Sequence, residues 1–270
     1  MRIGSRDFAT TGHTYIMGIL NVTPDSFSDG GKFDQIDAAL KHAEEMIRDG
    51  ADVIDIGGES TRPWGYTKIS DEEETDRVVP VIEAVKKEFG IPISVDTYKS
   101  GVAEAAAQAG ADLINDIWGL KYDPHMSEVI AKSGLACCLM HNRDNTEYRN
   151  FMEDMKQDLR ETIALAKAAG IADDKIILDP GVGFAKSYEN NLEVIRRLKE
   201  FNELKYPVLL GTSRKSVIGL TLDLPAAERV EGTIVTTVMA VEAGCMFVRV
   251  HDVKENHRAI QMAEAILDRK

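Results

Sequence analysis

The sequence predicts an α/β fold, a single (β/α)8 TIM barrel in which eight parallel strands alternate with helices around one core. Eight short apolar runs alternate with longer segments of helical periodicity, and glycines follow several of these segments. The chain has 270 residues, close to the roughly 250 of one such barrel, and contains no Pro/Gly/Ser-rich linker. We therefore expect one domain over residues 1–270. An open doubly wound sheet is the alternative, although it usually has fewer strands and often a G-x-G-x-x-G turn, which follows none of these runs.

The eight apolar runs are rich in β-branched residues and leucine, as expected for strands that are buried on both faces of a parallel sheet. They comprise residues 15–20, 53–56, 93–95, 113–114, 135–140, 176–178, 208–210 and 247–250. Each run is short for a helix, so we predict one barrel strand at each of them.

The segments between these strands carry helix signals. Apolar residues between Ile36 and Ile47 fall on one helix face, and Gly50 follows as a stop. Ser70 and Glu73 form a capping box that opens the next helix, and the glutamates at 72–74 are expected only to interact with the helix dipole. The remaining predicted helices are residues 103–109, 126–132, 151–169, 192–203, 228–243 and 255–269.

Composition and charge exclude several classes of protein. With 21 glycines, 8 prolines and 44% hydrophobic residues, the chain is neither collagen-like nor disordered. Its 32 Lys and Arg against 45 Asp and Glu give a net charge of −13, which argues against nucleic acid and acidic membranes as partners. No apolar run approaches the roughly 18 residues of a membrane span, and the first residues lack a signal-peptide core, so we expect a cytoplasmic protein. The 3 cysteines have no metal-ligand spacing, and we expect reduced packing residues.

Polar or charged residues follow all eight predicted strands. They are Asn21; Glu59, Ser60, Thr61 and Arg62; Asp96; Asn115 and Asp116; His141, Asn142 and Arg143; Asp179; Ser213, Arg214, Lys215 and Ser216; and Arg249 and His251. In (β/α)8 barrels the chemistry takes place at the carboxyl ends of the strands, where these residues would meet. The sequence therefore predicts a catalytic face at that end of the barrel.

Asp96, Asn115 and Asp179 give this face two carboxylates and an amide. Such groups can bind a flat heterocycle rich in N–H donors, by the geometry with which carboxylates bind Arg. Each aspartate could instead cap the helix that follows it, although Pro180 and a glycine-rich turn make this less suitable for Asp179. Asp55 lies within a strand and must be paired, so we expect it either to brace the site or to contact the ligand from below.

Five cations lie on the same face, at Arg62, Arg214, Lys215, Arg249 and His251. Four of them follow the seventh and eighth strands, where barrels commonly bind phosphate. Arg side chains and the amides at helix starts bind phosphate oxygens well. Exposed surface cations are the alternative, but the small residues among 211–216 allow the backbone to approach a ligand closely. We therefore predict a phosphorylated or pyrophosphorylated substrate.

Seven segments of the chain resemble motifs of the dihydropteroate synthase family. Residues 17–31 (MGILNVTPDSFSDGG) resemble its first signature, and residues 55–63 (DIGGESTRP) its second. Five shorter matches are VDT at 95–97, IND at 114–116, LDPG at 178–181, TSRKS at 212–216 and VRVHD at 248–252. The matches occur in order along nearly the whole chain, and the first is long enough to be specific.

This resemblance implies a transferase that joins 6-hydroxymethyl-7,8-dihydropterin pyrophosphate to 4-aminobenzoate in folate biosynthesis, with 7,8-dihydropteroate and pyrophosphate as products. Pyrophosphate would leave from the pterin methylene carbon, stabilised by Mg²⁺ and by the cations of the site. The carboxylate of Asp96 would favour a cation-like pterin fragment, and a neutral aromatic amine has no obvious need of a general base. The family is usually homodimeric, and sulfonamides mimic its 4-aminobenzoate substrate.

The resemblance also assigns residues to roles. The catalytic positions are Asp96, Lys215, Arg249 and His251. The pterin pyrophosphate positions are Thr61, Asp96, Asn115, Asp179, Phe184, Gly211, Lys215, Arg249 and His251. The 4-aminobenzoate positions, which involve the loops 22–32 and 60–67, are Phe27, Thr61, Arg62, Pro63, Lys215 and Ser216. Asn21 matches the position associated with Mg²⁺.

Trp64 departs from the family pattern, which usually reads Ser-Thr-Arg-Pro-Gly in the second loop. Here Trp64 stands between Pro63 and Gly65, beside the implied 4-aminobenzoate pocket. Because loops accept insertions easily, it could be a tolerated surface residue. The sharper hypothesis is that Trp64 alters the discrimination between 4-aminobenzoate and sulfonamides.

Two other classes of protein remain as alternatives. Methyltransferases that carry a methyl group from methyltetrahydrofolate to a corrinoid protein share a pterin-binding barrel. Their reaction releases no pyrophosphate, so it needs neither the long first loop, nor the TSRKS turn, nor the Arg-x-His ending. A non-catalytic pterin-binding protein is expected to have lost some residues of this face, and none is missing here.

Overall fold

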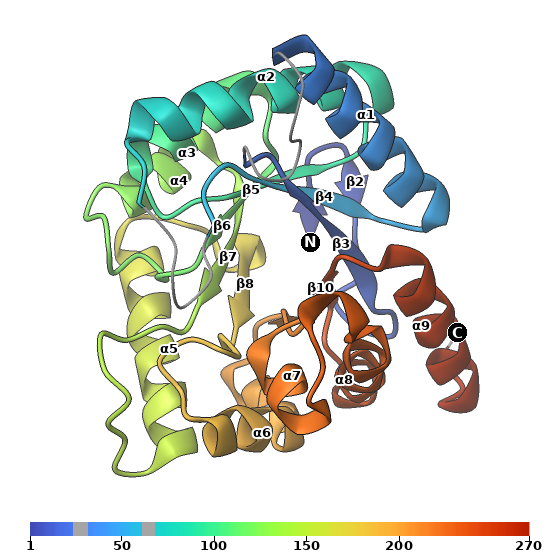
Figure 1. The fold of residues 1–270 in the computed structure, drawn as a ribbon. Coiled ribbons are helices and arrows are strands. Elements are labelled where there is room, and N and C mark those ends of the chain that lie inside the picture. The colour runs from blue at the N-terminus through green and yellow to red at the C-terminus, as the bar shows by residue number, and fades with distance from the viewer. Residues whose placement is uncertain (24–31, 61–67, 270) are drawn as a thin grey trace.

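A computed structural model describes residues 1–23, 32–60 and 68–269, and its main sheet has eight parallel strands (Figure 1). They are β3 (Tyr15–Asn21), β4 (Val53–Gly57), β5 (Ile93–Asp96), β6 (Leu113–Asp116), β7 (Ala136–Met140), β8 (Ile176–Asp179), β9 (Leu209–Leu210) and β10 (Phe247–Val250). Their hydrogen-bonded order is β8-β7-β6-β5-β4-β3-β10-β9, and a parallel bridge between Leu178 and Val208 joins the two ends. The sheet therefore closes on itself, which confirms the (β/α)8 barrel and excludes the open doubly wound sheet.

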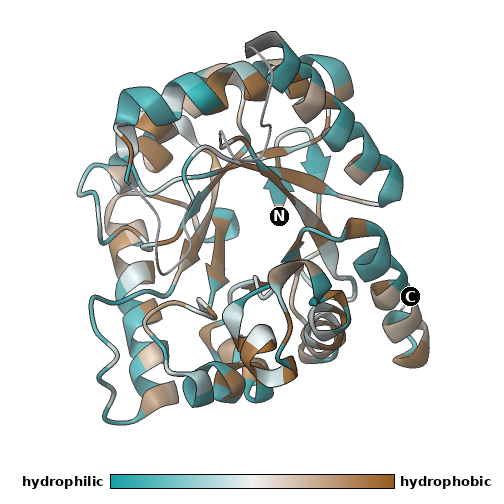
Figure 2. Cartoon of the chain, in the orientation of Figure 1, coloured by the Kyte–Doolittle hydropathy of each residue, from teal (hydrophilic) through white to brown (hydrophobic). Residues whose placement is uncertain are grey.

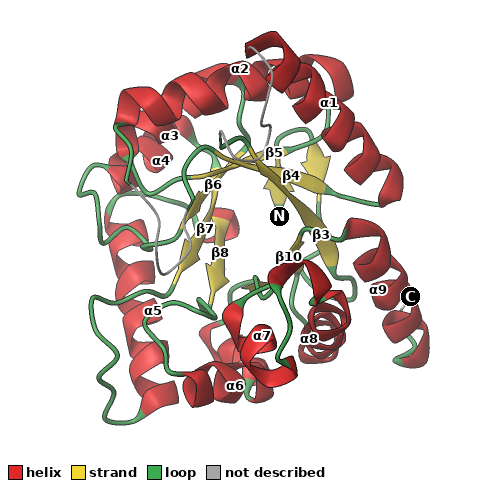
Figure 3. Cartoon of the chain, viewed as in Figure 1, coloured by secondary structure: helices red, strands yellow, loops and turns green. Residues whose placement is uncertain are grey.

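Helices form the outer layer around the strands (Figure 3). The α-helices are α1 (Lys32–Asp49), α2 (Asp71–Phe89), α3 (Ser100–Ala109), α4 (Met126–Ser133), α5 (Phe151–Ala168), α6 (Tyr188–Arg196), α7 (Ser216–Leu222), α8 (Val230–Ala243) and α9 (Val253–Ile266). The described residues also include the short 3-10 helices η2 (Asp173–Lys175), η3 (Leu198–Leu204) and η4 (Ala226–Glu228). Each α-helix lies between two barrel strands or follows the last one, which is the alternation that the sequence predicts.

Successive side chains of a barrel strand pack alternately into the barrel interior and into the layer between the strands and the helices. Val53 and Leu113 pack inside the barrel, whereas their neighbours Ile54 and Ile114 pack against the helices. Because both faces are buried, the strands are hydrophobic along nearly their whole length (Figure 2). The cysteines are free and buried, in line with the prediction of packing residues.

An N-terminal hairpin of β1 (Arg2–Ile3) and β2 (Arg6–Asp7) was not predicted. Ile3 and Phe8 are buried in the core of the barrel interior, and the Phe8 ring lies 5.5 Å from that of Phe247. Phe247 is the first residue of β10, so the hairpin covers the amino-terminal end of the barrel. A ligand must therefore enter from the opposite end, where the predicted catalytic face lies.

The predicted helix over residues 192–203 is wrong, because the chain forms α6 and then the 3-10 helix η3. Leu198, Phe201 and Leu204 are all buried, and their spacing of three residues matches the three residues per turn of a 3-10 helix. The predicted helix over 228–243 starts later, as α8, and η4 precedes it. Helix α7, which follows the seventh barrel strand, was not predicted.

The start of α2 agrees with the prediction in part. Ser70 Oγ accepts a hydrogen bond from the Glu73 N–H at 3.2 Å, as an N-cap does. The Glu73 carboxylate pairs with Arg77, so it does not complete the capping box. The glutamates at 72–74 were expected only to interact with the helix dipole, and for Glu74 this is wrong. Its residue is only 1% exposed, and its carboxylate pairs with Lys99.

Five residues with predicted roles lie outside the described part of the chain, namely Phe27, Thr61, Arg62, Pro63 and Trp64. Their roles stay predictions. Nowhere in residues 1–23, 32–60 and 68–269 does a helix combine the length and the apolar character that crossing a bilayer requires.

Candidate active site

Three strands bring a guanidinium group and two carboxylates together at the carboxyl end of the barrel. Arg249 on β10 donates from Nε to Asp55 Oδ2 at 2.5 Å and from Nη2 to Asp96 Oδ2 at 2.7 Å. Asp55 is fully buried and Asp96 is 3% exposed. A buried carboxylate needs such a partner, and Asp55 braces Arg249 in one of the two roles that the sequence left open.

Several polar atoms beside this ion pair have unused hydrogen-bonding capacity. Asn115 Nδ2 donates to Asp55 Oδ2 at 3.4 Å, a long contact. Within the described residues, Asp55 Oδ1, Asp96 Oδ1 and Ser94 Oγ are buried without a hydrogen-bond partner. Buried polar atoms are almost always paired, so these three mark a place where a ligand or water completes the bonding. The unpaired carboxylate oxygens can only accept, which matches a ligand with N–H donors.

The proposed ligand space beside this ion pair has a second part, which is lined by Asp179, Lys215 and Phe184. A side chain at Gly211 would lie 3.6 Å from Asp179 Oδ2 and 3.9 Å from Lys215 Nζ, so glycine keeps the space between these charges open. Lys215 Nζ also lies 4.8 Å from the centre of the Phe184 ring. Asp179 uses its Oδ1 to accept a hydrogen bond from Gly181 N at 2.7 Å. One carboxylate oxygen of Asp179 therefore orders its own turn, and the other faces Gly211.

Neither aspartate caps a helix, which was the alternative role. Lys99 occupies the N-cap position of α3, and Ser187 occupies that of α6. Asp96 and Asp179 are the last residues of β5 and β8, and their side chains lie at the barrel interior.

Burial shifts the pKa values of these groups toward their neutral forms. Burial, opposed by Arg249, raises the pKa of Asp96 to about 7. Burial also raises the pKa of Asp179 and lowers that of Lys215 to about 8. Burial alone would lower the pKa of Arg249, but the nearby carboxylates raise it above its usual value. Arg249 is therefore a fixed charge, whereas Asp96 and Lys215 can change protonation near neutral pH, as groups in active sites often do.

The cations predicted to bind phosphate do not form a uniform patch. Arg249 lies between carboxylates, and Arg214 forms its own ion pair with Asp252, with Nε 3.1 Å from Oδ2. Ser213 Oγ accepts the backbone N–H of His251 at 3.1 Å and lies 3.0 Å from its Nδ1. These contacts hold the His251 ring at the end of β10. Ser216, the first residue of α7, is exposed.

Asn21 ends β3 beside Asp96. A Cβ atom at Gly57 would lie 3.6 Å from Asn21 Oδ1 and 3.9 Å from Asp96 Oδ2, so both oxygens flank the same glycine. Oxygens of this kind are the ligands that Mg²⁺ prefers. In the described segments no three His, Cys, Asp or Glu side chains gather as a metal site. The donor set fits an ion that takes one or two protein ligands and completes its shell with water and phosphate, as Mg²⁺ usually does.

A buried ion network near the second strand was missed by sequence reasoning. Lys99 Nζ lies 2.7 Å from Glu59 Oε2 and 2.7 Å from Glu74 Oε2, and Glu59 also accepts from the Tyr98 hydroxyl at 2.5 Å. Glu59 Oε2 accepts the backbone N–H of Ile69 at 3.0 Å as well. The network thus fixes the chain on both sides of residues 61–67. A lysine near a helix start gave no signal that it would be buried.

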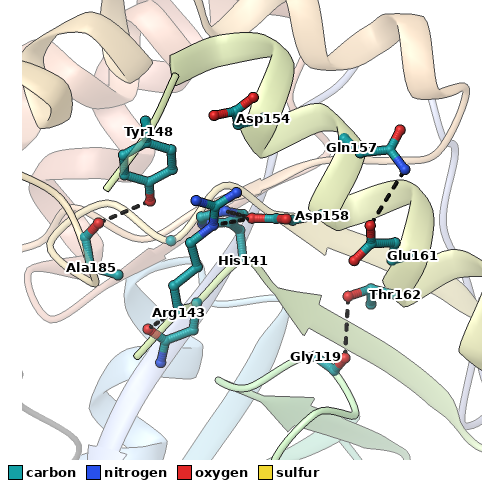
Figure 4. A network of polar contacts seen from close by, with 12 residues as sticks. Gly119, His141, Arg143, Tyr148, Asp154, Gln157, Asp158, Glu161, Thr162 and Ala185 are labelled. Atoms are coloured by element: carbon teal, nitrogen blue, oxygen red, sulfur yellow. Dashed lines mark hydrogen bonds and ion pairs between the residues drawn. The ribbon is translucent and has the colours of Figure 1, made fainter. Parts of the chain in front are cut away.

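Some polar residues of the predicted catalytic face order the surrounding loops instead of facing the ligand space. His141 Nε2 and Arg143 Nε both bond Asp158 Oδ2 on α5, at 2.8 and 2.5 Å (Figure 4). Asp116 accepts the backbone N–H groups of Trp118 and Leu120 and so closes the turn that follows β6. Among the described residues, the predicted set therefore contributes the following to the ligand space: Asn21, Asp96, Asn115, Asp179, Phe184, Gly211, Lys215 and Arg249.

Comparisons with known proteins show the family to which the chain is similar. The model of the pterin binding enzyme family matches residues 17–251. A dihydropteroate synthase of Clostridium beijerinckii is 62% identical over 270 residues, which is 100% of both chains. The crystal structure of a dihydropteroate synthase from Clostridium difficile in the presence of pteroic acid has a TM-score of 0.93 and 52% identity, and each chain is covered over 100%. That of Xanthomonas albilineans with 4-aminobenzoic acid has a TM-score of 0.90 and 40% identity over 94% of this chain and 93% of the other.

Proposed function

The chain belongs to the pterin-binding enzymes and, among them, to the dihydropteroate synthases, and we propose the corresponding reaction for it. It is a transferase that condenses 6-hydroxymethyl-7,8-dihydropterin pyrophosphate with 4-aminobenzoate and gives 7,8-dihydropteroate and pyrophosphate in folate biosynthesis. One observation supports this activity above the others: the unpaired Oδ1 of Asp96 and the Oδ2 of Asp179, which faces Gly211, lie at the carboxyl end of the barrel beside Arg249 and Lys215.

The pterin ring is proposed to bind among Asp96, Asn115 and Asp179. A pterin carries an aminopyrimidine edge with adjacent N–H donors, and a carboxylate can accept two parallel hydrogen bonds from such an edge. Phe184 offers an aromatic face beside this space, close to the ammonium group of Lys215. The unpaired Oδ1 of Asp96 gains a partner when the ligand enters, which removes the cost of its burial.

The reaction separates charge, and the site supplies groups of both signs for it. As the bond from the methylene carbon to the pyrophosphate oxygen breaks, positive charge develops on the pterin and negative charge on the leaving group. Asp96 is proposed to stabilise the first, and Arg249, Lys215 and His251 are proposed to stabilise the second. Charged groups that are already oriented in a buried site stabilise such a transition state strongly.

Asn21 is proposed to hold Mg²⁺ together with phosphate oxygens of the substrate. When bound, the ion would neutralise charge on the leaving group. The 4-aminobenzoate substrate is proposed to contact Lys215 and Ser216 together with Phe27, Thr61, Arg62 and Pro63, which lie outside the described residues.

We also propose that two copies of the chain associate through α7 and α8. Leu220 is 68% exposed and Val235 is 59% exposed, and an apolar cavity of about 340 Å³ lies between α6, α7 and α8. Exposed apolar patches of this kind commonly mark interaction surfaces, and a two-fold dimer buries the same patch twice. Sedimentation of the wild-type protein and of Leu220→Glu tests this: a shift from dimer to monomer supports the proposal, and a wild-type monomer refutes it.

We propose that the protein consists of one domain and is located in the cytoplasm. Residues 1–270 act as one pterin-binding domain, since the family match covers 17–251. A cytoplasmic location is supported by the three cysteines, which remain free thiols, as is usual in a reducing compartment.

The activity is tested by following both products together. Purified protein is mixed with the pterin pyrophosphate, 4-aminobenzoate and Mg²⁺, and we expect dihydropteroate and pyrophosphate in equal amounts. Pterin binding without either product would favour a binding protein, and methyl transfer from methyltetrahydrofolate would favour the corrinoid methyltransferases.

A further inference from the structure

The turn that follows β8 is held in place by the side chain of the residue directly after it and by two side chains from other parts of the fold. This turn, residues 181–185, carries Phe184. Its carbonyl oxygens at Gly181 and Phe184 accept hydrogen bonds from Lys186 Nζ, each at 2.9 Å. The carbonyl of Val182 accepts from Lys215 Nζ at 2.5 Å, and that of Ala185 accepts from the Tyr148 hydroxyl at 2.9 Å (Figure 4).

The backbone of this turn depends on such contacts. Gly181, Gly183 and Ala185 all have positive φ, at 67°, 91° and 49°. For alanine this conformation is unfavourable, so it persists only where the surroundings enforce it. A Cβ atom at Gly181 would lie 2.1 Å from the carbonyl oxygen of His141, which shows how closely the turn is pressed against the end of β7.

The Lys186 ammonium group has a third acceptor in His141 Nδ1, at 3.0 Å. An ammonium group can only donate, so Nδ1 must present its lone pair and the imidazole proton lies on Nε2. That N–H then points at Asp158 Oδ2, 2.8 Å away. Lys186, His141 and Asp158 thus form a hydrogen-bonded chain behind the turn, in which the His141 ring is buried and the other two side chains are partly buried. All three N–H bonds of Lys186 are engaged within the protein.

We infer that Lys186 is a positioning residue for the pterin substrate: from behind the pocket it fixes the turn that presents Phe184 and whose Gly181 N–H binds Asp179. This inference rests on the proposed function, in which Phe184 and Asp179 bind the pterin. Lys186 touches no substrate, because its donors are already used. It acts through the backbone of the turn and through its electric field.

The charge of Lys186 adds to the effect of these contacts on Asp179. Burial raises the pKa of Asp179, whereas Lys215 and Lys186 oppose that rise. Burial lowers the pKa of Lys186 itself to about 7, against the attraction of Asp179. The charged and titratable groups that face Lys186 are Asp179, Lys215, Asp158, Arg143 and His141. At pH 6 Lys186 carries its charge in most molecules, so its removal disturbs Asp179 more at pH 6 than at pH 8.

Substitutions at Lys186 separate the two contributions. Lys186→Met removes every donor and the charge, whereas Lys186→Gln keeps two N–H donors without the charge. Lys156→Met is the matched control: only 4% of the Lys156 side chain on α5 is exposed, but this lysine pairs with Glu153 and Glu203.

The experiment measures KM for the pterin pyrophosphate, KM for 4-aminobenzoate at saturating pterin, and kcat, at pH 6 and pH 8. For Lys186→Met we expect the pterin KM to rise about tenfold or more, the equivalent of about 1.4 kcal/mol, while the 4-aminobenzoate KM stays within about twofold. The rise is larger at pH 6. Lys186→Gln shows a smaller rise with the same dependence on pH, and Lys156→Met leaves both KM values unchanged.

Three results would overturn the inference. One is a folded Lys186→Met protein whose pterin KM lies within about twofold of the wild type. Another is an equal rise of both KM values, which would indicate a general disturbance. The third is loss of the fold in both Lys186 variants, which would make Lys186 a core residue of general importance. A wild-type protein that forms no product would instead refute the proposed function before any variant is compared.

Discussion

Replacement of Asp96 by asparagine tests the proposed charge separation most directly. The carboxylate of Asp96 is buried, its Oδ2 lies 2.7 Å from Arg249 Nη2, and its Oδ1 has no partner among the described residues. Two unit charges about 4 Å apart interact by about 4 kcal/mol at an effective dielectric constant of about 20. Asparagine keeps the shape and a dipole, so we expect the variant to lose about 2–4 kcal/mol of transition-state stabilisation, a fall in kcat of about 30- to 1000-fold.

Ground-state binding should suffer much less in this variant. The side-chain oxygen of asparagine still accepts a hydrogen bond, so we expect pterin affinity to fall by less than about tenfold, or about 1.4 kcal/mol. The assay measures kcat from pyrophosphate release at saturating substrates and pterin affinity by calorimetry. Asp112→Asn is the control: Asp112 is buried at the other end of β5, where it bonds Lys86 and the Ile93 N–H. It should lower stability and leave kcat unchanged.

The same substitution has a second observable in the pH profile. Because burial raises the pKa of Asp96 to about 7, this carboxyl group is protonated in most molecules below that pH. For the wild type, kcat/KM for the pterin substrate should therefore fall as the pH drops through about 7, and the Asp96→Asn variant should lack this limb. A folded variant with kcat within about threefold of the wild type and an unchanged acid limb would refute the electrostatic role, since about threefold is less than 1 kcal/mol.

Two further predictions concern buried charge outside the substrate space. Burial lowers the pKa of His141 from 6.5 to about 4, so between these pH values the unfolded chain binds a proton that the folded protein does not. The free energy of unfolding should fall by about 3 kcal/mol as the pH drops from 6.5 to 4. Urea unfolding measured at each pH should show that the free energy of unfolding of His141→Gln depends less on pH than that of the wild type. Lys99→Met leaves Glu59 and Glu74 buried without their cation and should cost about 3–5 kcal/mol in thermal unfolding. An unchanged melting temperature would show that water already reaches these carboxylates.

Most of the fold could be predicted from the sequence, because the barrel strands are buried on both faces and therefore appear as apolar runs. Runs such as the one at β7 are apolar throughout, because side chains on both faces of the strand are buried. The polar residues at or just after the end of each run mark the rim. Asp96 and Asp179 could be predicted for this reason, since each is the last residue of its strand. Helix ends could be predicted where a single residue decides them, as Ser70 does at the start of α2.

Pairing between distant residues could not be predicted in the same way. Arg249 and Asp55 are 194 positions apart, and nothing local distinguishes Arg249, which lies between two carboxylates, from Arg214, which pairs with Asp252. Glu74 has the spacing of an ordinary first-turn glutamate, and only the position of Lys99 in the fold makes it a buried partner. The break between α6 and η3 has the same cause, because the core selects a spacing of three residues at Leu198, Phe201 and Leu204.

The balance of charge in the site gives a physical reason to expect Mg²⁺. Asp55, Asp96 and Asp179 carry three negative charges when ionised, against the positive charges of Arg249 and Lys215, and the chain as a whole has a net charge of −13. A pyrophosphate group adds further negative charge, which an already paired Arg249 offsets only in part. A divalent cation beside Asn21 would supply the missing positive charge.

The two halves of the pterin substrate should differ in their dependence on Mg²⁺. The affinity of a hydroxymethylpterin without phosphate should not depend on Mg²⁺, whereas the affinity of its pyrophosphate should fall when Mg²⁺ is chelated. Calorimetry with both ligands measures this without turnover. Asn21→Ala should raise the Mg²⁺ concentration that half-maximal pyrophosphate-ester binding requires, and it should leave binding of the phosphate-free pterin intact. Equal Mg²⁺ dependence for both ligands would place the ion against the pterin ring instead, and no dependence for either would mean that the protein's own cations suffice.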